Sequence, residues 1–228
     1  MRLVLFDIDG TMLWSQGAGR RSMNAALIEA IGGSGPADYR YDGKTDPQIA
    51  RDIMRHEGVE ETRIDPLIGP LLERYVVLLA EELRYRRLAL FPGVVELVQR
   101  LERERDVIVG LLTGNVRAGA ELKLRAAGLD FARFRVGAFG SDHHERPALP
   151  AIAQRRAREL VGAEVRGADV IVIGDTPADI ACGRGIGARA IAVATGHYDV
   201  DALAVHAPAA VFASLADTDA VMEAIRDA

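Results

Sequence analysis

The sequence predicts an α/β fold, a doubly wound parallel sheet with a Rossmann-like core and an inserted all-helical cap domain. Short segments rich in Val, Ile and Leu alternate along the chain with segments of helical periodicity. Their apolar residues are continuous rather than alternating, which is typical of strands that are covered on both faces. A long helical block without a convincing strand follows the first of these segments, and this block predicts the cap.

Five strands are expected, four of them strong and the last one weaker. They cover residues 2–8, 107–113, 170–175, 188–195 and 209–214. Strand, helix and strand follow one another, which predicts parallel strands joined by right-handed crossovers.

Three helices are expected between these strands. Proline precedes the first of them and glycine ends the other two, as is usual at helix boundaries. These helices cover residues 93–105, 117–128 and 148–162.

The inserted block contains three further helical patterns separated by Gly, Pro and Asp. They cover residues 22–33, 45–58 and 62–87. Pro66 and Pro70 are expected at or near the start of the last helix, where proline is tolerated. We therefore expect an α/β core formed by residues 1–14 and 88–228, and a helical cap formed by residues 15–87.

Composition excludes several classes of function. The chain has 228 residues, 49% of them hydrophobic, and a net charge of −5, with acidic and basic residues interspersed. No basic stripe is present to bind a phosphate backbone, so we expect no nucleic-acid partner. The single cysteine excludes an internal disulfide, and no Cys/His cluster has zinc-site spacing. No apolar stretch approaches the ~20 residues of a membrane span. We expect a cytoplasmic protein without a membrane partner, either a monomer or a homodimer.

Polar residues follow three of the expected strands where each one ends. Because ligands of an open parallel sheet bind beyond the carboxyl ends of its strands, we expect these residues to meet at one edge. They are Asp7 and Asp9, then Thr113, Gly114 and Asn115, then Asp175 with Asp179 one helical turn beyond it. Four clustered carboxylates would repel one another unless a positive charge lay among them, and oxygen ligands suit Mg²⁺.

A carboxylate beside Mg²⁺ can also act as a nucleophile, which predicts a covalent route to phosphate hydrolysis. One aspartate would stay ionised and form an aspartyl-phosphate, while the other would carry the proton to and from the reacting oxygens. Asp7 and Asp9 are two residues apart, so on an extended strand they would point the same way. Gly10 would then let the backbone turn sharply after them.

Three short motifs occur in order on the expected elements: "DIDGT" at residues 7–11, "LLTGN" at 111–115 and "GDTPAD" at 174–179. With them the sequence resembles the haloacid dehalogenase superfamily over its whole length, and within that superfamily it is most similar to phosphoglycolate phosphatases and related small phosphate-monoester hydrolases. Any one motif alone would be a weak signal, but three in the right order are specific. The helical insert looks like the cap of that family.

The resemblance implies a role for each motif residue. Asp7 would be the nucleophile, Asp9 the general acid and base, and Thr113 a ligand of the transferring phosphoryl group. The metal would be Mg²⁺, held by Asp7, by the backbone carbonyl of Asp9 and by Asp175, with Asp179 supporting it through water or a hydrogen bond. The neighbouring residues are expected to contact the substrate; these are Gly10, Thr11, Gly114 and Asn115. For Thr113 and Asn115, capping of the next helix is an open alternative.

The family also needs a cation beside the phosphoryl group, usually a lysine followed by proline. Here that stretch reads "HHERPALP" at residues 143–150, so Arg146 occupies the matching place. Arginine would supply a permanent charge and a bidentate fork in place of a point charge. Lys123, on the helix after "LLTGN", is a rival for the role, and the two could also act together.

In the cap, "GKTD" at residues 43–46 is not a nucleotide-binding loop, because the required upstream glycine is replaced by Asp38 and no strand leads into it. By the resemblance, Lys44, Thr45 and Asp46 would face the active site and touch the substrate. A helix cap is an equal alternative for this segment.

The sequence thus predicts a Mg²⁺-dependent phosphatase that hydrolyses a small phosphorylated metabolite through an aspartyl-phosphate. A phosphomutase of the β-phosphoglucomutase type would use the same two aspartates, and a phosphonatase would use Lys44 as its only cap lysine. Outside these enzymes, a phospho-accepting or binding protein without hydrolysis is the remaining alternative.

Overall fold

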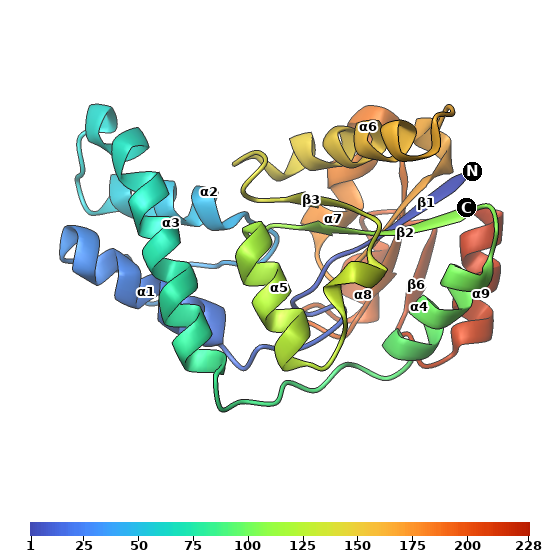
Figure 1. Ribbon diagram of the computed structural model, residues 1–228, viewed down its shortest axis with the longest axis horizontal. Coiled ribbons are helices and arrows are strands. Elements are labelled where there is room, and N and C mark those ends of the chain that lie inside the picture. The colour runs from blue at the N-terminus through green and yellow to red at the C-terminus, as the bar shows by residue number, and fades with distance from the viewer.

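A computed structural model describes all 228 residues and contains one six-stranded sheet, every strand of which is parallel to its neighbours. The strand order is β3-β2-β1-β4-β5-β6, with helices on both sides of the sheet (Figure 1). The predicted doubly wound fold is therefore confirmed. The strands are β1 (Arg2–Phe6), β2 (Val107–Thr113), β3 (Val136–Phe139), β4 (Val170–Gly174), β5 (Arg189–Val193) and β6 (Ala210–Phe212).

The edge strand β3 was not predicted. It has four residues, one of which is Gly137, so it lacks the β-branched run that marks the other strands. It pairs with the last residues of β2, where Thr113 lies beside Phe139. The first strand also ends earlier than expected, at Phe6, so Asp7 and Asp9 lie in the loop that follows it.

The expected core helices are present with slightly shorter bounds, and three further helices follow the fourth and later strands. The core helices are α4 (Val94–Arg103), α5 (Arg117–Ala126), α6 (Leu149–Val161), α7 (Pro177–Cys182), α8 (Val200–Ala204) and α9 (Thr218–Asp227). Single 3₁₀ turns lie at Phe131–Arg133, Arg146–Ala148, Gly167–Asp169 and Gly183–Ile186. None of the helices combines the length and the apolarity that crossing a membrane requires.

Alternate residues of the central strand face opposite sides of the sheet. Val4 and Phe6 are fully buried in the cluster that contains the apolar faces of α4 and α9, whereas Leu3 and Leu5 are fully buried against α6. Burying one such side chain contributes about 1.5–3 kcal/mol relative to leaving it exposed. The double cover explains why the strands read as continuous apolar runs.

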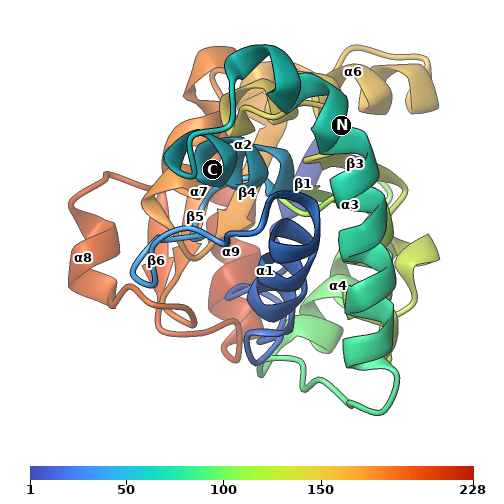
Figure 2. The ribbon, with the colours of Figure 1, turned by 90° about the vertical axis from the view of Figure 1, so that its left-hand side faces the viewer.

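Helices α1 (Ala18–Ile31), α2 (Asp46–His56) and α3 (Glu61–Leu83), which we call the cap, lie together beyond one end of the sheet (Figure 1). Figure 2 looks onto the cap, where α1 and α3 run side by side. Their buried residues belong to the same apolar cluster as one face of the sheet, so the cap packs directly on the core.

The two prolines of α3 lie inside the helix rather than near its start, because α3 begins at Glu61. Pro66 and Pro70 cannot donate to the carbonyl groups four residues earlier, which removes two helical hydrogen bonds. A buried stripe on the same helix offsets this loss; it consists of Ile64, Ile68, Leu71, Tyr75, Leu79 and Leu83.

Candidate active site

The loop after β1 brings its two aspartates to the edge of the sheet where β4 also ends. The backbone N–H of Asp7 still donates to the carbonyl oxygen of Ile173, at 2.9 Å, and so continues the pairing of β1 with β4. Gly10 then turns the chain with φ +84°, and a Cβ atom there would lie 2.2 Å from Oδ2 of Asp175. Only glycine allows both the left-handed conformation and this close approach.

A cavity of about 440 Å³ lies between this edge of the sheet and the cap. Its walls include Asp7, Asp9 and Asp175 from the core, together with Gly114 and Asn115 after β2. Cap residues from the start of α1 and from the segment before α2 complete it. All but Asp179 of the strand-end residues that the sequence singled out therefore line one cavity.

Three buried carboxylates can hold a metal ion at the floor of this cavity. Oxygen atoms of Asp7, Asp175 and Asp179 lie within 4.8 Å of one another. Burial, together with the neighbouring carboxylates of Asp179 and Asp9, raises the pKa of Asp7 to about 6, against the opposing effect of Arg146. Burial and the same crowding raise the pKa of Asp175 well above its usual range. The cluster is thus short of positive charge.

The hydrogen bonds show which of these oxygens are free to bind a cation. Both oxygens of Asp179 are engaged, Oδ2 by the backbone N–H and hydroxyl of Thr176 and Oδ1 by Arg146. Asp175 accepts one bond, at Oδ1, from the Thr11 hydroxyl at 3.0 Å. Carboxylate oxygens that are hard and still free suit Mg²⁺, so the residues present fit this metal.

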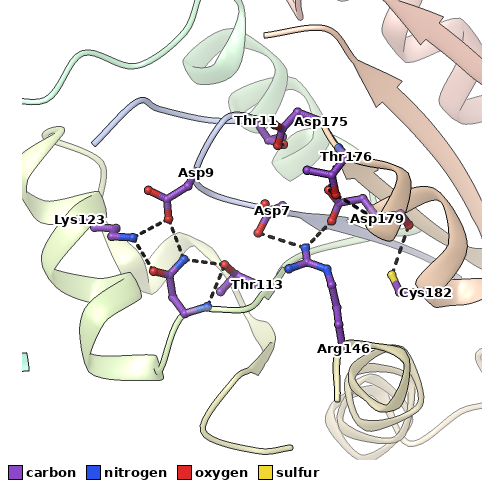
Figure 3. Close-up of polar contacts among 11 residues, drawn as sticks. Asp7, Asp9, Thr11, Thr113, Lys123, Arg146, Asp175, Thr176, Asp179 and Cys182 are labelled. Carbon is purple, nitrogen blue, oxygen red and sulfur yellow. Dashed lines mark hydrogen bonds and ion pairs between the residues drawn. The ribbon is translucent and has the colours of Figure 1, made fainter. Parts of the chain in front are cut away.

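Arg146 lies beside the nucleophile expected at Asp7. Its side chain is 4% exposed, and its Nη2 atom contacts Oδ1 of Asp179 and lies 3.3 Å from Oδ1 of Asp7. In Figure 3 the guanidinium points up between these two carboxylates. Nε of Arg146 is buried without a partner. One guanidinium therefore faces three crowded carboxylates.

Lys123 reaches the other aspartate. From α5, its Nζ atom donates to Oδ2 of Asp9 at 2.5 Å and to Oδ1 of Asn115 at 2.6 Å (Figure 3). Burial raises the pKa of Asp9, but the Lys123 ammonium and the Asn115 amide outweigh it and lower the pKa below its usual value. The two rival cations thus lie at the same cavity and contact different carboxylates.

Thr113 and Asn115 do not cap the helix that follows them. α5 begins after Val116, which supplies no side-chain cap. Nδ2 of Asn115 donates to Oγ1 of Thr113 at 2.8 Å and to Oδ2 of Asp9 at 2.9 Å. These two residues are therefore tied to Asp9 and line the cavity rather than ending a helix.

The cap is fastened to the core by residues 45 and 46. The Thr45 hydroxyl donates to the carbonyl oxygen of His144 at 2.5 Å. The backbone N–H of Asp46 donates to the carbonyl oxygen of Gly114 at 2.8 Å. The backbone N–H of Val116 donates to Oδ2 of Asp46 at 2.8 Å, so a cap side chain satisfies the N–H of the residue that precedes the first turn of α5. We call these three bonds the latch.

The predicted substrate contacts divide into two groups. Lys44 lines the cavity, with its Nζ atom 3.1 Å from Oδ2 of Asp52 and 2.7 Å from the Tyr39 hydroxyl. Thr45 is fully buried outside the cavity wall and caps α2 by accepting from the backbone N–H of Gln48, so the helix-cap alternative describes it. Gly10 and Thr11 also lie behind the wall, since the Thr11 hydroxyl is committed to Asp175.

Several cavity residues carried no signal in the sequence analysis. Trp14, Arg20, Tyr41 and His197 line the cavity, and the rings of Trp14 and His197 meet edge to face at 5.1 Å. The sequence offered one hint, at Arg20. No acidic residue lies three or four positions from it on its helix, so no ion pair along the helix is available to it.

Residues 1–187 match the family model described as haloacid dehalogenase-like hydrolase. No curated protein sequence matches the chain.

Solved structures resemble the chain along nearly its full length at low sequence identity, which shows the fold alone. A hydrolase from Pseudomonas syringae is 20% identical, with a TM-score of 0.74 and coverage of 98% of both chains. A predicted phosphoglycolate phosphatase from Haemophilus somnus is 20% identical, with a TM-score of 0.67 over 97% of this chain and 98% of that one. A candidate beta-phosphoglucomutase from Bacteroides vulgatus is 19% identical, with a TM-score of 0.69 over 100% and 89% of the two chains.

Proposed function

The chain belongs to the haloacid dehalogenase-like hydrolases, and from that premise we propose that it is a Mg²⁺-dependent phosphatase acting on a small phosphorylated metabolite, phosphoglycolate phosphatase-like. The observation that carries the proposal is the pair of aspartates at one cavity, each beside its own cation. Asp7 contacts Arg146 and Asp9 contacts Lys123. Pairs of titratable groups whose surroundings push their pKa values apart are typical of acid and base chemistry.

In the first step, an oxygen of Asp7 attacks phosphorus and the bond to the leaving oxygen breaks. The leaving oxygen takes a proton from Asp9. Arrival of a negatively charged phosphate raises the proton affinity of Asp9, which the Lys123 ammonium lowers in its absence. Oδ1 of Asp9 is buried and has no partner, so it is the atom available to carry this proton.

In the second step, water attacks the phosphorus of the aspartyl-phosphate and Asp7 is released. Asp9, which lost its proton in the first step, accepts the proton of the attacking water. Thr113 and Gly114 line the cavity beside Asp7, where together with Arg146 they would hold the phosphoryl oxygens. Mg²⁺ bound by Asp7 and Asp175, with Asp179 behind them, would neutralise charge on the phosphoryl group.

The test is a screen of the purified protein with Mg²⁺ against phosphorylated metabolites, phosphoglycolate and sugar phosphates included. Released inorganic phosphate is the readout, and a parallel series with EDTA tests the metal. We expect release that EDTA abolishes and added Mg²⁺ restores. Product analysis by NMR separates hydrolysis from phosphoryl transfer to a sugar, which would identify a mutase instead.

A further inference from the structure

The cavity wall contains four basic side chains of Lys and Arg type, and three of them have carboxylate partners. Lys123 is 2.5 Å from Asp9, Arg146 is 3.3 Å from Asp7, and Lys44 is 3.1 Å from Asp52. The fourth is Arg20, in the first turn of α1, and it forms no ion pair. A partly buried guanidinium without a counterion is the natural partner of an anion that comes with the ligand.

Arg20 is held in place although it lacks a carboxylate partner. Its Nη2 atom donates to the backbone carbonyl of Tyr39 at 2.7 Å, and its Cζ atom lies 4.2 Å from the centroid of the Tyr41 ring. Arginine has five N–H groups in a planar fork, and this hydrogen bond uses one of them. The guanidinium is therefore fixed on one side and has donors left for a planar or tetrahedral oxyanion.

Acidic residues of the cap do not compete for these donors. Asp42 pairs with Arg40 at 3.1 Å, and Asp46 accepts from the backbone N–H of Val116. The first turn of α1 contains no acidic residue, and Gly17 before it supplies no side-chain cap. Arg20 is thus the one Lys or Arg side chain of the cavity wall that no carboxylate pairs.

We propose that Arg20 binds a second anionic group of the substrate, a carboxylate or a second phosphate on the part that leaves with the alkoxide. This deepens the proposed function and rests on it: the substrates are small phosphate monoesters that carry another negative charge. One end of such a molecule lies on Asp7 and Thr113 and the other on Arg20. A cavity of about 440 Å³ fits a ligand of this size.

The experiment compares three esters of similar length: phosphoglycolate, 2-hydroxyethyl phosphate, which is neutral at the distal end, and ethylene glycol bisphosphate. For the wild-type protein we expect kcat/KM to be ~10- to 100-fold higher for at least one charged ester, because charge-assisted bidentate bonds have this worth. The ester preferred identifies the second anion as a carboxylate or a phosphate. Arg20→Gln should remove most of this preference, because it should lower kcat/KM for the preferred charged ester ~10- to 100-fold more than for the neutral ester.

Two further variants separate recognition from folding. Arg20→Lys keeps the charge without the fork and should restore part of the preference. Arg21→Gln is the matched control, since Arg21 is the next residue, pairs with Glu82 at 2.6 Å and lies outside the cavity wall. It should leave the preference unchanged. Equal losses on all three esters in Arg20→Gln, or no preference in the wild-type protein, would overturn the proposal.

A binding measurement distinguishes failure of this inference from failure of the proposed function. Calorimetry with the Asp7→Asn variant measures Kd for phosphoglycolate and for 2-hydroxyethyl phosphate without turnover. We expect ~10-fold tighter binding of the charged ester, lost when Arg20→Gln is added. Equal Kd values overturn the role of Arg20 even if both esters are hydrolysed. Absence of phosphate release from every ester counts against the phosphatase, while the difference in Kd still decides the role of Arg20.

Discussion

Asp7 and Asp9 are two residues apart in the chain, yet their surroundings are opposite in electrostatic effect. Burial and neighbouring carboxylates raise the pKa of Asp7 to about 6, although Arg146 is beside it. At Asp9, Lys123 and Asn115 overcome burial and lower the pKa. The difference arises from the count of charges, because Arg146 faces a crowded cluster whereas Lys123 contacts one carboxylate. We call the surroundings of Asp7 with Arg146 the Asp7 half and those of Asp9 with Lys123 the Asp9 half. Two identical side chains thus differ in proton affinity, as the proposed division of roles requires.

The first prediction breaks the pair at the nucleophile. Asp7→Asn removes the attacking carboxylate and should lower kcat for an aryl phosphate more than about 1,000-fold, as expected when the group that forms the covalent bond is lost. Stopped assays of phosphate release measure this loss. Circular dichroism should show an unchanged fold, and activity within tenfold of the wild type would contradict the assigned role.

The second prediction concerns the Asp7 half. Arg146→Met leaves Asp7, Asp175 and Asp179 without their buried guanidinium, so we expect kcat/KM to fall by ~100-fold or more. The variant should also lose roughly 3–5 kcal/mol of unfolding free energy, because breaking a buried pair leaves uncompensated charge. Urea unfolding measures that loss. Mg²⁺ should restore part of the stability, and a fully stable Arg146→Met variant without metal would show that the cluster needs no cation.

The third prediction concerns the Asp9 half. Lys123→Met removes the main cause that lowers the pKa of Asp9, so that pKa should rise. Because Asp9 must be deprotonated to activate water in the proposed mechanism, the acidic limb of the kcat profile should move to higher pH, so the loss relative to the wild type should be larger at about pH 5 than at about pH 8. A pH–rate series measures the shift. An Arg146→Lys series is the comparison, and a profile moved as far by that variant would mean that the halves are not separate.

The fourth and smallest prediction concerns Asp46, which lies beyond Asp9 on the Lys123 side. Burial raises the pKa of Asp46 from 3.8 to about 6, against Lys123 and the Val116 N–H. The folded state then holds a proton that the unfolded chain releases, so this group's contribution to stability falls as pH rises from about 4 to 6. Asp46→Asn keeps an acceptor for Val116 without the charge.

Denaturation of both proteins at pH 4, 5, 6 and 7 measures this effect. The stability of Asp46→Asn relative to the wild type should increase by ~1–3 kcal/mol across the interval and then level off. A difference that does not change with pH would mean that Lys123 stabilises the charged form of Asp46 as well as that of Asp9. Lys123 would then face two carboxylates rather than one.

The sequence contained enough information for the fold and for the floor of the cavity. Continuous apolar runs indicate buried parallel strands, and the ends of such strands converge, so Asp7, Thr113 and Asp175 could be placed together without coordinates. The short strand β3 could not be predicted, because four residues with a glycine have no distinct period. The sequence also could not predict which carboxylate each cation contacts. Arg146 lies on a 3₁₀ turn and Lys123 on a helix, and the rotation of both elements depends on packing.

The cap was harder to predict for a related reason. Its helices could be located by their periodicity, but the side chains that face the cavity depend on how the cap packs on the sheet. Nothing in the sequence distinguishes Arg20 from an ordinary surface arginine. Thr45 was expected to contact the substrate, but its hydroxyl donates to the carbonyl oxygen of His144. The prolines of α3 show the same dependence on packing. Proline locally favours the first turn of a helix, yet Pro66 and Pro70 lie inside α3 because its buried apolar stripe offsets their cost.

The latch has a consequence for the exchange of caps between proteins. On the core side it uses only backbone atoms, the carbonyl oxygens of Gly114 and His144 and the N–H of Val116. The side chains of the latch are therefore all encoded in the cap, as the adjacent pair Thr45 and Asp46, whereas the apolar contact between α3 and α5 is shared by cap and core. A chimaera that combines this core with a foreign cap needs those two residues in register, together with an apolar face that fits α5. The latch itself then forms again without any change of side chain in the core.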